Sequence, residues 1–137
     1  MFFQICFAAL VFTDILWTAT GLTSTDRDEF WHSHNELRKK PGGKYGPTAS
    51  NMRKMNWIPD IERLAQGWAN KCTFDHRPRK QRFIEGLGSV GESIYAWPGK
   101  QQPGDITLRV EGWFSEVDYF TYPRRCRPGK ECGHYIG

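Results

Sequence analysis

The chain has 137 residues, of which 39% are hydrophobic and 15% aromatic, and its formal net charge is +4. This length suits one domain, because single domains cluster at roughly 100–150 residues. The mean hydropathy of -0.63 excludes a membrane protein with several spans.

Residues 1–21 are predicted to be a secretory signal peptide. They are almost uncharged, with an apolar run from Ile5 to Phe12 and small residues suited to cleavage from Ala19 to Gly21. A core helix or a membrane anchor is the alternative, but Asp14 interrupts the apolar stretch, and a spanning helix needs roughly 20 apolar residues. We therefore expect a mature domain of residues 22–137, secreted to the extracellular space, with no transmembrane segment after signal cleavage.

The first predicted helix runs from Thr25 to Lys40. Thr25 can cap this helix, and acidic residues follow in the first turn, where the helix dipole favours negative charge. Pro41 and two glycines end it. One face of the helix carries Phe30, His34 and Leu37. We expect His34 to face the core and His32 to be solvated.

The second predicted helix runs from Pro59 to Phe74, after a Gly- and Pro-rich connection. Pro59 suits the first helical position. An apolar stripe at helical spacing consists of Ile61, Leu64, Ala65, Trp68 and Cys72. This stripe predicts that Cys72 faces the same core as Trp68. Within the connection, we expect an apolar anchor made of Met52, Met55 and Trp57.

Residues 77–89 are predicted to be a basic loop, and Val90 to Trp97 a short strand. A turn-rich loop then leads to a third helix from Asp105 to Tyr119. The buried stripe of this helix is predicted to be Ile106, Val110, Trp113 and Val117.

Two basic runs, residues 77–82 and 124–130, concentrate the positive charge. One interpretation is a site for a polyanion such as a glycosaminoglycan or a nucleic acid. We favour two solvated loops, because both runs contain Pro and neither has an aromatic residue interleaved, as binders of single strands require. No nucleic acid partner is expected.

The cysteines point to disulfides. Cys6 would leave with the signal, so that Cys72, Cys126 and Cys132 remain as disulfide candidates. An odd number indicates a free thiol, an intermolecular bridge or a missing partner. A zinc site of Cys126, Cys132 and His134 is the alternative, but the gap between these cysteines exceeds the usual structural-zinc spacing.

No familiar catalytic motif is present. The sequence lacks H-E-x-x-H, G-x-S-x-G and a P-loop. The run from Gly86 to Gly91 matches the dinucleotide fingerprint in letters only, because it precedes a predicted strand and does not open a helix.

Several short motifs occur in a fixed order from Phe30 to Tyr135. They are His34-Asn35 with Arg38; Met52, Met55 and Trp57; Leu64, Ala65, Trp68, Ala69 and Cys72; Gly91-Glu92-Ser93-Ile94; Trp113 with Glu116; and Cys132-Gly133-His134-Tyr135. This ordered set resembles the CAP superfamily (SCP/TAPS), which includes cysteine-rich secretory proteins, antigen 5 and pathogenesis-related 1. It is most similar to the secreted venom-allergen-like members.

The resemblance implies an α+β fold, an α-β-α sandwich with helices around an antiparallel sheet. It also implies a cleft that carries two histidines and two glutamates, here His76, Glu92, Glu116 and His134. No cofactor is required, but His76 and His134 suit a divalent cation such as zinc, with the two carboxylates orienting the imidazoles. Ser93 departs from the pattern, which has Asn there.

The chain ends where the family pattern continues into further strands and later cysteines, which implies an incomplete CAP domain with its final strands missing. The resemblance thus leaves two disulfide arrangements open. Cys126 and Cys132 bridge each other and leave Cys72 as a buried thiol, or each pairs with a later cysteine in longer relatives.

Three functions are weighed for such a chain. The first is a non-enzymatic extracellular binding protein for a sterol, a fatty acid or a protein receptor, or one that modulates host immunity. The second is a metal-dependent hydrolase that uses the two-His, two-Glu cleft. The third is a truncated product without a working site. We expect the first, because no Ser or Cys is marked as a nucleophile.

Overall fold

The structure is a computed structural model that describes residues 21–40, 51–96, 102–123 and 125–136. The predicted signal peptide, except for Gly21, lies outside the described residues. The chain divides into two compact units. Of the described residues, the first unit contains residues 21, 58–96 and 102, and the second contains residues 22–40, 51–57, 103–123 and 125–136.

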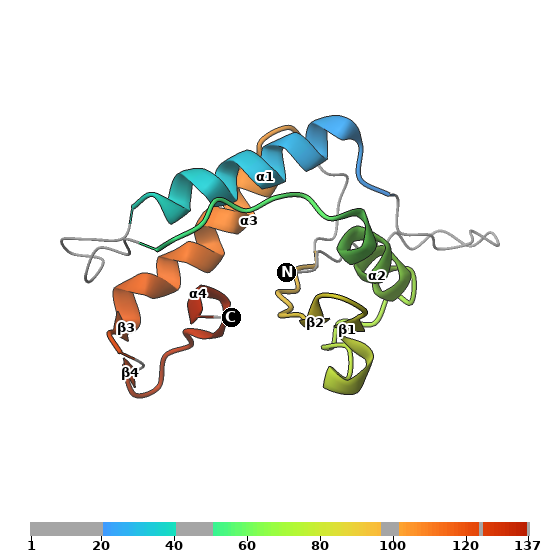
Figure 1. The fold of residues 1–137 in the computed structure, drawn as a ribbon. Coiled ribbons are helices and arrows are strands. Elements are labelled where there is room, and N and C mark those ends of the chain that lie inside the picture. Colours follow the sequence, from blue (N-terminus) through green and yellow to red (C-terminus); the bar gives the residue numbers. More distant parts are fainter. Residues whose placement is uncertain (1–20, 41–50, 97–101, 124, 137) are drawn as a thin grey trace, which may run out of the picture. The chain divides into compact units, whose positions relative to one another are not determined.

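Helices are followed by pairs of short strands along the described chain (Figure 1). The α-helices are α1 (Ser24–Arg38), α2 (Pro59–Ala69), α3 (Asp105–Phe114) and α4 (Gly133–Ile136), and the 3-10 helices are η2 (Arg79–Gln81) and η3 (Ser115–Tyr119). The strands are β1 (Phe83–Ile84), β2 (Gly88–Ser89), β3 (Phe120–Thr121) and β4 (Arg125–Cys126). β1 pairs antiparallel with β2, and β3 with β4. The described residues are therefore mixed α and β, as predicted. No helix among them is both long and apolar enough to cross a membrane.

Helix α1 forms where the sequence predicts it, but Thr23, not Thr25, caps it. The side chain of Thr23 accepts from the backbone N–H of Asp26 over 3.1 Å, and Asp26 accepts from the N–H of Thr23 over 2.8 Å. This reciprocal capping box satisfies two backbone donors that the helix itself leaves unpaired.

Helix α2 ends at Ala69, five residues before the predicted end. The chain then turns, and Cys72 adopts a positive φ of 49°. Cys72 is exposed, so the prediction that it faces the core beside Trp68 is wrong. The helical spacing that placed it there does not continue beyond Ala69.

The first unit also contains a β-hairpin. Phe83 lies opposite Ser89, and Ile84 lies opposite Gly88. Gly86 and Gly88 have φ values near +80°, a conformation that favours glycine. The predicted strand from Val90 to Trp97 is wrong for its described part, since residues 90–96 form no strand. The pairing residues come earlier, on either side of a turn at residues 85–87.

Helix α3 has a cap that comes from another helix. Gly104 precedes α3 with a left-handed backbone and has no side chain to offer as a cap. Instead, Oε1 of Glu29 on α1 accepts from the backbone N–H of Thr107 over 2.8 Å and from its hydroxyl over 2.9 Å. A carboxylate at this position also suits the positive end of the helix dipole. The predicted helix ends early, because residues 115–119 form η3.

The core of the second unit lies where α1 packs against α3. The predicted stripe of α3 is buried and meets apolar residues of α1; the buried side chains are Phe30, Leu37, Ile106, Val110, Trp113 and Val117. Residues 52–57 are fixed to the same helix. Oδ1 of Asn35 accepts from the N–H of Met55 over 2.8 Å, and Nε1 of Trp31 donates to the carbonyl of Met55 over 2.7 Å.

His34 faces the core as predicted, and His32 is exposed. Nδ1 of His34 donates to the carbonyl of Phe30 over 2.8 Å. Burial lowers the pKa of His34, because desolvation penalises the charged imidazolium more than the Phe30 carbonyl stabilises it.

The free energy of unfolding is expected to fall as the pH is lowered below about 6.5, the usual pKa of an unfolded histidine. Below this pH the His34 imidazole binds a proton in the unfolded chain but stays neutral in the folded protein. The free energy of unfolding therefore decreases as the pH falls toward the pKa of folded His34. Denaturant unfolding over a pH series measures this. His34→Gln should flatten the profile. Identical profiles for wild type and His34→Gln would show that His34 contributes nothing to the pH dependence.

The structure contains the local disulfide, Cys126–Cys132, with a sequence separation of six. Cys132 is buried, and the bridge connects β4 to the segment that leads into α4. The cysteines thus form a disulfide and not the alternative zinc site with His134.

Removing this disulfide with Cys126→Ala and Cys132→Ala is expected to lower the free energy of unfolding by about 2 kcal/mol, because a short loop is no longer closed in the unfolded chain. Denaturant titration of the double variant against the oxidised wild type measures the difference. An unchanged midpoint would show that the bridge does not stabilise the second unit.

Candidate functional site

Each of the four histidine and glutamate residues singled out in the sequence belongs to a His–Glu pair. In the first unit, Nδ1 of His76 lies 2.7 Å from Oε1 of Glu92. The same oxygen accepts from the backbone N–H of Arg77 over 2.9 Å. His76 lies in the loop after α2 and Glu92 follows β2, so the pair holds together two segments that flank the hairpin.

Trp68 on α2 holds the loop that carries His76. Its Nε1 donates to the carbonyl of Asp75 over 2.8 Å, and Oδ1 of Asp75 accepts from the N–H of His76 over 2.7 Å. Two cations lie over the indole ring: the Lys71 ammonium at 4.5 Å and the Arg77 guanidinium at 5.4 Å from the centroid. The sequence marked Trp68 only as a core residue, since no pattern reveals a hydrogen bond to a loop carbonyl.

Glu92 has one carboxylate oxygen without a hydrogen-bond partner in the described part of the chain. Its side chain is 0% exposed. Oε2 makes no hydrogen bond among the described residues, although Oε1 accepts two. A buried, unpaired carboxylate oxygen is costly, so its presence is a feature to be explained.

The second pair joins η3 to α4. Nδ1 of His134 lies 2.6 Å from Oε1 of Glu116. The other oxygen, Oε2, accepts from the backbone N–H groups of His134 over 2.8 Å and Tyr135 over 3.2 Å. Glu116 therefore accepts with both oxygens, Oε1 from the imidazole and Oε2 from two backbone N–H groups of α4, whereas Glu92 accepts with only one oxygen among the described residues.

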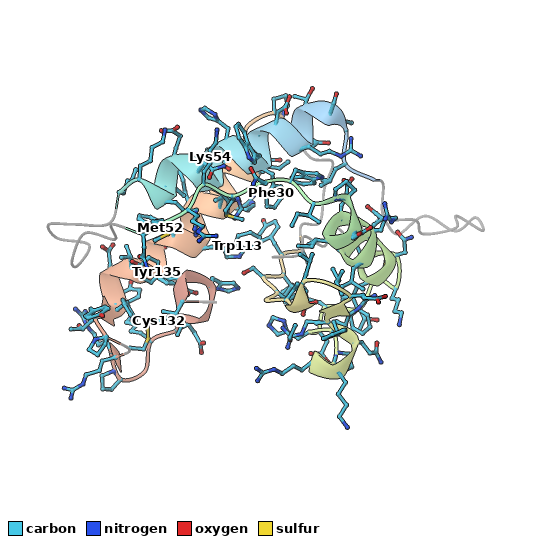
Figure 2. All side chains as sticks on the ribbon, in the orientation of Figure 1. Phe30, Met52, Lys54, Trp113, Cys132 and Tyr135 are labelled. Carbon is cyan, nitrogen blue, oxygen red and sulfur yellow. A yellow bond between two sulfur atoms is a disulfide. The ribbon has the colours of Figure 1, made fainter. Side chains whose placement is uncertain are left out.

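Trp113 stacks on the imidazole of His134. The two ring centroids are 5.7 Å apart and the planes differ by 17°. Trp113 also lies 6.2 Å from the ring of His34 and 6.4 Å from that of Phe30. Phe30 and Trp113, both labelled in Figure 2, therefore connect the core of the second unit to the His–Glu pair.

The two pairs have the same proton arrangement. A carboxylate can only accept, so Nδ1 of each imidazole carries the proton in the pair. In the neutral ring, Nε2 then keeps its lone pair. Carboxylates that bond to Nδ1 in this way orient metal-binding histidines in many proteins.

Nε2 of His76 and Nε2 of His134 therefore each keep a lone pair of the kind that binds a divalent cation such as zinc. Among the residues that the structure describes, no group of three or more His, Cys, Asp or Glu could hold a metal ion. Each unit supplies one imidazole with its carboxylate, and the cysteines of the second unit are committed to their disulfide.

Comparisons with known proteins agree on one family. A protein-family model described as "CAP: Cysteine-rich secretory protein family" matches residues 31–135. The cysteine-rich secretory protein LCCL domain-containing 1 of Gallus gallus is 35% identical over 124 residues, which cover 84% of this chain and 22% of that protein. LCCL domain-containing 2 of Homo sapiens is 34% identical over 120 residues, with 80% and 22% covered.

A shorter relative is also similar. GLIPR1-like protein 1 of Mus musculus is 34% identical over 112 residues, which cover 79% of this chain and 44% of that protein. The chain therefore spans less than a quarter of the length of the LCCL relatives and less than half of this one.

Proposed function

The chain belongs to the CAP (cysteine-rich secretory protein) family, and from this membership we propose that it is a secreted, non-enzymatic binding protein of the extracellular space. The observation that carries the proposal is the family match over residues 31–135, which includes both His–Glu pairs. The family also leads us to expect the α-β-α sandwich.

The proposed ligand is a sterol or a fatty acid. The chain is rich in aromatic residues, and such ligands need a concave apolar surface. An extracellular receptor through which the protein acts on host immunity is the other partner that family membership suggests. The names of the two LCCL domain-containing relatives include the word secretory, which supports the proposed secretion.

The hydrogen-bond partners of the two imidazoles bear on the proposed non-enzymatic role. In the described part of the chain, neither His76 nor His134 hydrogen-bonds to a Ser, Thr or Cys side chain. Covalent catalysis requires a nucleophile within hydrogen-bond reach of its base.

Saturable binding of radiolabelled sterol and fatty acid tests the proposal. The full chain is expressed in cultured cells and purified from the medium, where mass spectrometry should find an N-terminus from residue 19 to residue 22. We expect binding that unlabelled ligand displaces. If the protein stays in the cells, the proposed secretion is wrong, and if neither lipid binds above an unrelated secreted control, lipid binding is wrong.

A metal-dependent hydrolase is the second candidate, and one observation favours it. Oε2 of Glu92 is buried without a hydrogen bond among the described residues, and a free carboxylate oxygen is what a general base needs. Glu116 has no such free oxygen, because Oε1 pairs with the imidazole of His134 and Oε2 accepts from its backbone N–H. Cleavage of a peptide library that disappears in Glu92→Gln would support this function, and no cleavage with zinc added would exclude it for these peptides.

A further inference from the structure

The basic run after α2 lies between exposed apolar side chains. Residues 71–89 contain five Lys or Arg and two acidic residues. Within the same segment, Phe74 is 65% exposed, Phe83 is 64% exposed and Leu87 is 47% exposed. We call these residues of the first unit, from Lys71 to Ser89, the basic–apolar segment.

The hairpin geometry explains why Phe83 is exposed. Successive residues of a strand point to opposite faces, so Phe83 and Ile84 cannot share one. Ile84 is half-buried, and Phe83 therefore lies on the open face, opposite Ser89. Leu87 follows in the turn, where its N–H donates to the carbonyl of Ile84 over 3.0 Å. Neither Phe74 nor Phe83 makes a ring contact with another described residue.

Two basic side chains of the segment make no ion pair with a described acidic residue. Arg79 and Lys80, in η2, are exposed, and neither makes an ion pair within the described residues. Lys71 and Arg77 lie over Trp68, and Arg82 is half-buried, so these three are already engaged with the protein. Arg79 and Lys80 therefore present free positive charge next to β1, which begins at Phe83.

We propose that the basic–apolar segment docks the protein onto an anionic phospholipid membrane. Exposed cations beside exposed aromatic and aliphatic side chains suit the region between headgroups and acyl chains, where anionic lipid attracts the cations and the apolar side chains leave water. A sulfated polysaccharide would use the cations only and would leave Phe74, Phe83 and Leu87 in water. The occupant that matches both kinds of side chain is therefore a lipid surface.

His76 lies within the segment, but the five side chains that carry the proposal take no part in the His–Glu pairs, and the proposal does not depend on a lipid ligand in a cleft. None of Phe74, Arg79, Lys80, Phe83 or Leu87 contacts Glu92 or His76 in a hydrogen bond or ion pair. Membrane docking and soluble sterol binding are therefore measured independently.

Co-sedimentation of the full chain with vesicles tests the proposal, at an ionic strength of about 0.15 M. We expect binding to phosphatidylcholine vesicles that contain phosphatidylserine. Binding to vesicles of pure phosphatidylcholine should be weaker by a factor of about ten or more. Arg79→Glu with Lys80→Glu should weaken binding to the anionic vesicles about tenfold or more. Phe74→Ser with Phe83→Ser should also weaken it about tenfold or more.

The matched control is Lys39→Glu with Arg63→Glu, which changes the net charge equally at two exposed positions outside the segment. This control should bind the vesicles nearly as well as the wild type. Binding to heparin is measured in parallel. The proposal is overturned if the wild type binds both kinds of vesicle equally or not at all, or if the control weakens binding as much as Arg79→Glu with Lys80→Glu. The proposal is also overturned if Phe74→Ser with Phe83→Ser binds the anionic vesicles as well as the wild type does and heparin competes with the vesicles for the protein. That result would indicate a polyanion site.

Discussion

Trp113→Ala is expected to lower the free energy of unfolding by about 3–5 kcal/mol, as large-to-small substitutions of buried aromatic residues do. Trp113 is buried between α1 and α3, where its ring meets those of Phe30, His34 and His134. The substitution removes the core contact and the stacking partner of His134 together. Denaturant unfolding gives the change in free energy, and the ring-current shift of the His134 imidazole protons reports the loss of stacking.

Leu108→Ala is the matched control, because Leu108 lies on the same helix and is exposed. It should change the free energy of unfolding by about 0.5 kcal/mol or less. Trp113→Phe keeps an aromatic ring in the same place and should restore much of the imidazole shift. A Trp113→Ala protein with wild-type stability would show that this ring does not stabilise the second unit.

Glu116→Gln is expected to move the proton of His134 from Nδ1 to Nε2. Glu116 accepts from three donors, two backbone N–H groups on Oε2 and Nδ1 on Oε1. An amide has one accepting oxygen, and if that oxygen stays with the two N–H groups, the amide NH₂ faces Nδ1 and donates to it. The proton then occupies Nε2, the nitrogen proposed as a metal ligand, so zinc affinity should fall about 10–100-fold. Nitrogen chemical shifts of His134 report the tautomer.

Glu92→Gln should behave differently, because a single oxygen of Glu92 accepts from both His76 and Arg77. The amide oxygen can take that place, so His76 should keep its proton on Nδ1. Glu111→Gln, at an exposed position of α3, controls for the loss of one negative charge. If His134 retains its Nδ1 proton in Glu116→Gln, the hydrogen-bond arrangement assigned to this pair is incorrect.

The helices were predictable where local signals agree with burial. The stripe from Ile106 to Val117 is buried as its spacing predicts, and Pro59 begins α2. The predictions failed where a contact distant in sequence or a change in backbone conformation determines the structure. Cys72 continues a helical spacing in sequence, but the helix has already ended. The cap of α3 comes from Glu29, 78 residues before Thr107, and no local pattern contains it.

The candidate site was predictable as residue types but not as contacts. The family resemblance singled out His76, Glu92, Glu116 and His134, and their role as one cleft stays a prediction. The pairing of each histidine with its glutamate depends on the conformation of loops. Hydrophobic periodicity predicts helices and strands, but it does not predict how a loop runs. Trp68 and Trp113 have the spacing of core residues, yet one bonds to the carbonyl before His76 and the other stacks on His134.

The central claim is that the carboxylate of each His–Glu pair orients its imidazole so that the lone pair of Nε2 can bind a divalent cation. Zinc titration by calorimetry tests it most directly, with the wild type, His76→Ala, His134→Ala and the exposed control His32→Ala. The account predicts that the wild type binds zinc, that His76→Ala and His134→Ala each bind less of it, and that the control binds as the wild type does. No binding by the wild type, or unchanged binding in both His76→Ala and His134→Ala, would contradict it.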